Sequence, residues 1–138
     1  MTEISIINLL HDKTEPVDWH HHDVGQFFWV NKGVVMVETE HNRWMVASGC
    51  VGWLPWGCRH RTEVISKVEG RILYLSKNTV LEDLISPKLI QSDDFIQALL
   101  KRISEFSGQN LNEQQHRLLQ VLADEMKNSL LTIRIYTL

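Results

Sequence analysis

Histidines stand at two places in this sequence where their spacing could support metal or ligand binding. One is the run His20, His21 and His22, followed by Gln26, and the other is His60, which comes directly after a Pro-Gly turn. Residues two apart on a strand face the same side, so His20 and His22 can point together, with Gln26 an even step further and His21 outward. Three imidazoles and one amide oxygen suit Zn, Ni or Fe(II). We therefore predict a divalent metal site of His20, His22, Gln26 and His60.

Glycine and proline positions around these histidines form two spacing patterns. The first is His20-x-His22, Gln26 and, after six intervening residues, Gly33; the second is Gly49-x5-Pro55-x-Gly57-x2-His60. Both resemble the motifs of the cupin superfamily, although the first carries Gln26 where that family has Glu. The glycines can supply the positive φ that tight barrel corners need.

Further segments narrow the resemblance to the N-terminal domains of AraC-type transcription regulators. They are the Trp19-His20 start, Gln26, the Gly33-Val34 turn, the strand Asn42-Arg43-Trp44-Met45-Val46 and the approach Val51-Gly52-Trp53-Leu54-Pro55. The resemblance covers about residues 5 to 128 and implies an effector-sensing and dimerisation domain. In that family a helix-turn-helix half follows directly, and this chain ends at Leu138, about where that half would begin.

The pattern of apolar residues changes along the chain. Up to about residue 80 it alternates with period two between turn signals, which indicates a sandwich or barrel of short strands. The expected strands are 4–9, 26–30, 34–40, 43–47, 50–54, 60–67 and 71–76, with a turn at 68–70 and a possible last strand at 132–136. The predicted fold is mainly β: a small double-stranded β-helix (a cupin or jelly-roll barrel) over residues 1–90, and a helical appendage over 91–138. We expect one domain overall, with no helix-turn-helix present.

Two helices are predicted after the barrel, at 93–107 and 111–128. Ser92 is the expected N-cap of the first, and Asn110 with Glu113 resembles a capping box for the second. The apolar stripes are expected to comprise Phe95, Ile96, Leu99, Leu100, Ile103 and Phe106, then Leu118, Leu119, Leu122 and Met126. Because a barrel can bury its own core, we expect these helices to form a homodimer.

Composition limits the function classes. The formal net charge is −3 and no basic cluster is present, which argues against phosphate contacts by this segment. DNA contact is thus expected only through a helix-turn-helix half absent from this chain. Neither a secretory signal nor a membrane span is visible, and two cysteines are too few for a disulfide scaffold, so a cytoplasmic protein with no membrane partner is expected.

Two functions fit these residues. The first is a regulator domain that binds a small-molecule effector, a divalent metal or both in its barrel, with Phe28, Met36, Trp53 and His60 as ligand-binding residues and no catalytic residue. Gln26 favours this reading, because a neutral amide gives a divalent ion less charge than Glu does. The alternative is a stand-alone metal-dependent cupin enzyme, a dioxygenase or isomerase, with Fe(II) or Mn(II) on the same histidines.

Overall fold

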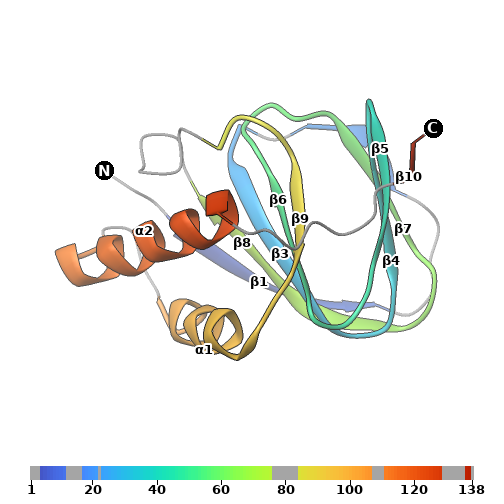
Figure 1. Ribbon diagram of the computed structural model, residues 1–138. Helices are drawn as coiled ribbons and strands as arrows, with labels where there is room; N and C mark the ends of the chain where they lie inside the picture. Colours follow the sequence, from blue (N-terminus) through green and yellow to red (C-terminus); the bar gives the residue numbers. More distant parts are fainter. Residues whose placement is uncertain are drawn as a thin grey trace.

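Two sheets face each other and two helices cover the outer face of one of them (Figure 1). The structure is a computed structural model, and it describes residues 4–11, 17–21, 23–75, 84–106, 111–128 and 136–137. Helices α1 (Asp94–Ile103) and α2 (Glu113–Asn128) follow the strands. This arrangement confirms the predicted fold class, a mainly β cupin-like barrel with two C-terminal helices.

Each sheet has five strands, all antiparallel. The first sheet has the order β1-β8-β3-β6-β9 and the second the order β10-β5-β4-β7-β2. The strands are β1 (Ile4–His11), β2 (Val17–His20), β3 (Gly25–Lys32), β4 (Val35–Thr39), β5 (Asn42–Val46), β6 (Cys50–Leu54), β7 (His60–Val64), β8 (Val68–Leu75), β9 (Lys88–Gln91) and β10 (Tyr136–Thr137). Consecutive strands often lie in different sheets, so a side chain on one sheet can face its sequence neighbours across the barrel.

The first sheet is buried on both faces, which gives the molecule two apolar layers. Along β3, Phe27 and Trp29 belong to the cluster that includes the helices, whereas Phe28 and Val30 belong to the barrel interior. The helices contribute Ile96, Leu99, Leu100, Ile103, Leu119, Leu122, Ala123 and Met126 to the first cluster. Each of the Ile, Leu and Met side chains contributes about 1.5–3 kcal/mol if fully buried. Phe95, expected in this stripe, is instead 55% exposed.

The three corner glycines adopt the positive φ expected of them. The φ angles are 87° at Gly33, 87° at Gly49 and 74° at Gly57. At Gly33 a Cβ would lie 2.0 Å from the backbone oxygen of Lys67, so a larger residue has neither the conformation nor the space.

The helix caps differ from those expected. Asp93, not Ser92, caps α1, because its carboxylate accepts from the Ile96 N–H at 2.9 Å. Ser92 donates instead to the carbonyl of Gly49 at 2.6 Å. The capping box of α2 pairs Asn112 with Gln115, through reciprocal bonds of 2.8 and 2.9 Å. The expected cap Asn110 lies outside the described residues.

Several strand boundaries also differ. The turn expected at 68–70 lies at 65–67, because β8 runs unbroken from Val68 to Leu75. Strands β2 and β9 were not expected as separate strands, and the last strand is the short β10, which pairs with β5. The rest of the expected last strand, 132–135, lies outside the described residues. Neither described helix is long and apolar enough to span a membrane.

Candidate functional site

One end of the barrel interior carries polar side chains. His60 begins β7, and its register partners are Thr39 on β4 and His20 on β2. Residues 60, 62 and 64 of β7 share a face, and Val64 lies in the core between the sheets, so this face is the inward one. His60 is accordingly only 2% exposed and Thr39 only 4%. The row His20, His60, Thr39 therefore lines the interior of the second sheet at the end where β7 starts.

The two histidines lie against each other in a defined orientation. Their ring centroids are 4.3 Å apart with the planes inclined by 59°. Nδ1 of His20 lies 2.8 Å from the carbonyl of Asp18, and Nδ1 of His60 lies 2.9 Å from that of Cys58. A carbonyl oxygen only accepts, so Nδ1 must donate, and in a neutral ring Nε2 then carries the lone pair. Metal-ligating histidines in proteins are commonly held by the same type of bond.

Gln26 reaches this region from the other sheet. The chain bends at Asp23 and Val24 between β2 and β3, so Gln26 lies on the first sheet and not on the strand of His20. Its register partners are Leu54 and Tyr74, and it shares the inward face of β3 with Phe28. The residue is 7% exposed, and within the part of the chain that the structure describes its Oε1 has no hydrogen-bond partner. A buried acceptor of this kind is costly unless a ligand or water satisfies it.

Two further polar groups face the same interior. Trp44, opposite Val37 in the register of β4 and β5, is 1% exposed, and its indole N–H also has no partner among the described residues. Tyr74 is the cross-strand neighbour of Gln26, and burial raises the pKa of its phenol, so the hydroxyl stays protonated around neutral pH. Sequence reasoning missed both groups, because an aromatic residue on a strand is ordinarily part of an apolar core.

A pocket of about 310 Å³ opens beside the histidine pair. It is lined by Thr39, Glu40, His41, Asn42, Pro55, Trp56, Gly57, Cys58, Arg59, Ile85 and Pro87. Thr39 belongs to the inward row, and the carbonyl of Cys58 is the one that holds His60. Burial, followed by the charge of Glu40, raises the pKa of the Cys58 thiol, which lowers the fraction of the reactive thiolate.

The other predicted site residues lie in different places. Phe28 is in the barrel interior. Trp53 faces the helices instead, because it alternates with the inward Gly52 and Leu54, and its indole donates to the Leu84 carbonyl at 2.8 Å.

Met36 alternates with the inward Val35 and Val37, so it lies on the outer face of the second sheet beside Met45 and Glu63. His22 lies outside the described residues. Among the described residues, no group of three or more His, Cys, Asp or Glu is placed to hold a metal ion.

Solved structures that are similar to this chain include ToxT and cupin proteins. One is ToxT from Vibrio cholerae: a structure at 11% identity aligns over 91% of this chain and 56% of that chain with a TM-score of 0.65. Another, described as ToxT bound to an unsaturated fatty acid, has 14% identity over 96% of this chain and 58% of that chain, with a TM-score of 0.60. This chain thus spans a little over half the length of ToxT.

A cupin barrel is also similar to this chain over a shorter stretch. An RmlC-like cupin from Shewanella frigidimarina has 17% identity over 60% of this chain and 72% of that chain, with a TM-score of 0.50. No curated protein sequence matches this chain. The sequence profile of the AraC-like ligand binding domain, in contrast, matches residues 10–132, which is most of the chain. The chain therefore belongs to the family of AraC-like ligand binding domains.

Proposed function

We propose that this domain is the effector-sensing module of an AraC-type transcription regulator, and that the effector binds at the polar end of the barrel. The observation that carries the proposal is the buried Oε1 of Gln26, which lacks a partner in a family of ligand-binding domains. A bound molecule that donates to this oxygen would remove the cost of burying it. Membership of this family favours a regulatory role over that of a cupin enzyme.

The proposed effector is a small amphipathic molecule with a polar head. His20, His60 and Gln26 present polar atoms at one end of the barrel, while the next rows inward carry Phe28 and Val37. The indole N–H of Trp44 adds one donor deeper in the interior. Related ToxT structures are described as holding an unsaturated fatty acid and an aryl-substituted butenoic acid. We therefore propose a carboxylic acid with an apolar body as the effector class.

A divalent metal at the same histidines is the second form of this proposal. Nδ1 donation to a backbone carbonyl orients Nε2 of His20 and His60 as neutral ligands, and Gln26 could add its oxygen. His22 is proposed as a further ligand of this metal, beside His20, His60 and Gln26. This donor set suits Zn or Ni, which would supply a positive centre for an acidic effector.

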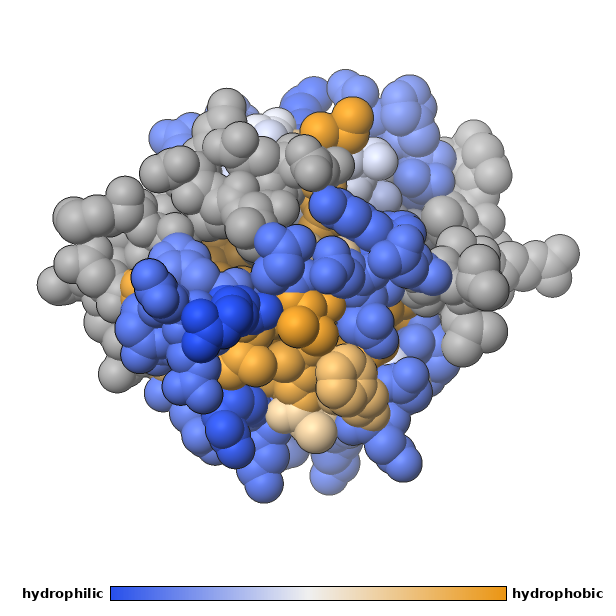
Figure 2. All heavy atoms as spheres, turned by 60° about the vertical axis from the view of Figure 1, so that its left-hand side comes forward, coloured by the Kyte–Doolittle hydropathy of each residue, from blue (hydrophilic) through white to orange (hydrophobic). Residues whose placement is uncertain are grey.

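We propose that α1 and α2 form a homodimer interface, and that effector binding acts on the rest of the regulator through this interface. Figure 2 shows an apolar area surrounded by hydrophilic side chains on the side of the molecule that carries the helices. Phe95 on α1 is 55% exposed, and Leu118 and Val121 on α2 are only partly buried. DNA contact is proposed for a helix-turn-helix half, because the described helices of this domain cover the barrel.

The test is thermal melting of the protein with a monounsaturated fatty acid, with Zn(II) and with both. We expect the fatty acid to raise the melting temperature, because binding to the folded state stabilises it. Gln26→Met and His60→Phe should lose this effect, whereas His116→Ala, whose histidine lies on α2 and lines neither the barrel interior nor the pocket beside it, should retain it. Equal effects in all variants would exclude the polar end as the site. Zinc content that is unchanged in His20→Ala and His60→Ala would exclude the metal form alone.

A further inference from the structure

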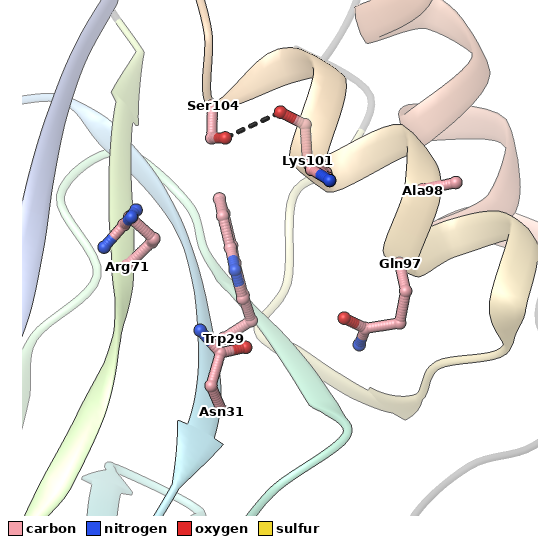
Figure 3. A pocket seen from close by; sticks show the side chains of 7 residues that line it. All are labelled: Trp29, Asn31, Arg71, Gln97, Ala98, Lys101 and Ser104. Carbon is pink, nitrogen blue, oxygen red and sulfur yellow. Dashed lines mark hydrogen bonds between the residues drawn. The ribbon is translucent and has the colours of Figure 1, made fainter.

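A second pocket, separate from the barrel interior, lies between the first sheet and α1. Its volume is about 390 Å³, and it is lined by Trp29, Asn31, Arg71, Gln97, Ala98, Lys101 and Ser104. Figure 3 shows the Trp29 ring between Arg71, which comes from β8, and Lys101 and Gln97, which come from α1. Trp29 lies on the helix-side face of β3, opposite to the face that carries Gln26 and Phe28. One layer of sheet thus separates this pocket from the proposed effector site.

The charge of this pocket is positive and is not neutralised by its own lining. Among the described residues that line the pocket, Arg71 and Lys101 are the charged ones, and none of these residues is a carboxylate. Within the described part of the chain neither cation forms an ion pair, whereas the neighbouring Arg102 lies 3.8 Å from Glu105. A concave site with two cations attracts anions, because their charges add in a space partly shielded from water.

The remaining polar groups are of the kind that orient an anion. Asn31 and Gln97 carry amide N–H donors, and Gln97 already donates to Ser92 at 2.6 Å, which fixes its side chain. Ser104 donates to the carbonyl of Lys101 at 2.6 Å and so closes the last turn of α1 beside the pocket. Trp29 is 4% exposed, so its ring forms a wall and not a large stacking surface. The volume falls in the range of about 300–1,000 Å³ that is typical of small-molecule sites.

We infer that this pocket binds a small organic dianion, whose anionic oxygen atoms pair with both Arg71 and Lys101, on either side of Trp29. Arg71 can bind a carboxylate or a phosphate through two parallel N–H donors, and Lys101 acts as a point charge. Because one cation belongs to β8 and the other to α1, the ligand would link the barrel sheet to the helix. The shared chemistry is a double negative charge on one small molecule, carried either by the two carboxylates of a dicarboxylate or by the single phosphate of a phosphomonoester.

The experiment uses the full chain, with succinate and glycerol 3-phosphate as probes and sodium chloride at equal ionic strength as the reference. Binding is measured by calorimetry and by the shift in melting temperature, for the wild type, Arg71→Gln, Lys101→Gln and the matched control Arg102→Gln. We expect at least one probe to bind, and binding to weaken about tenfold or more when either pocket cation is removed. Arg102→Gln should bind as the wild type does, and the tighter probe names the ligand class.

Two results would overturn the inference. One is that neither probe binds the wild type beyond the effect of chloride. The other is that Arg102→Gln loses as much affinity as Arg71→Gln and Lys101→Gln, which would indicate attraction by surface charge alone. Circular dichroism melts of each variant show that a loss of binding does not come from unfolding. Gln26→Met should retain the binding, so the barrel site and this pocket are tested independently.

Discussion

Gln26 occupies a buried position where an apolar side chain of similar length would make the ligand-free domain more stable. Its Oε1 has no hydrogen-bond partner among the residues that the structure describes, and the residue is 7% exposed. A buried acceptor without a partner costs about 1–3 kcal/mol of unfolding free energy. Methionine is unbranched and adapts to irregular space, so Gln26→Met removes the acceptor with little change in volume.

We expect Gln26→Met to raise the unfolding free energy by about 1–3 kcal/mol. For a domain of this size each kcal/mol corresponds to a rise in melting temperature of about 4 °C. Urea unfolding followed by circular dichroism measures the change, with an unchanged m-value as the sign that the unfolded state is unaffected. The same substitution should abolish effector binding, which would show that stability is given up at this position for function.

The matched control is Gln97→Met, at a glutamine that does have a partner. Gln97 Nε2 donates to Ser92 Oγ at 2.6 Å, so its loss should lower the unfolding free energy by about 0.5–1.5 kcal/mol. The two substitutions are chemically identical and are expected to differ in sign. If Gln26→Met also destabilises by more than about 1 kcal/mol, Gln26 Oε1 is satisfied in solution and the reasoning is refuted.

Three other substitutions test the remaining features. Phe95→Glu should give a folded monomer in light scattering, because its ring is 55% exposed; a wild-type chain that is already monomeric at high concentration contradicts the dimer. Asn112→Ala removes the capping-box bond to the Gln115 N–H and should lower the unfolding free energy by about 1 kcal/mol in urea titrations. Burial is the larger cause of the raised pKa of Cys58, and the negative charge of Glu40 is the second cause. Glu40→Gln removes this charge, so the pKa should fall and iodoacetamide should alkylate the thiol faster. An unchanged alkylation rate would show that Glu40 does not act on Cys58.

Local turn chemistry is the part of the fold and site that could be predicted from the sequence. Gly49 and Gly57 adopt positive φ angles that few other residues tolerate, and with Pro55 they form the turn after which His60 begins a strand. The meeting of His20 with His60 follows from this register. The apolar faces of the two helices could also be predicted, because a period of 3.6 residues identifies the buried face of a helix.

The sequence could not predict, for the strands of the first sheet, which side chains point into the barrel and which point toward the helices. Phe27, Phe28, Trp29 and Val30 are all buried, since helices cover one face and the second sheet covers the other. A strand buried on both sides shows no alternation, so nothing local assigns Trp53 to the helix side. The unpaired indole of Trp44 is likewise a property of the assembled interior and not of its strand.

Burial on both faces also explains how binding inside the barrel could reach the helices. Gln26 and Phe28 point into the barrel from β3, while Phe27 and Trp29 on the same strand pack against the helix layer. The inner and outer side chains share one backbone, and close-packed interiors transmit small displacements because they contain little space to absorb them.

Strand β8 also carries inward and outward side chains on one backbone: Tyr74 is paired with the inward Gln26, and Arg71 with the outward Trp29. An effector that moves β3 or β8 would therefore change the surface on which α1 packs, and a ligand between Arg71 and Lys101 would oppose or support that movement. If this coupling exists, each ligand must change the affinity of the other by the same factor, which calorimetric titration of one in the presence of the other measures directly.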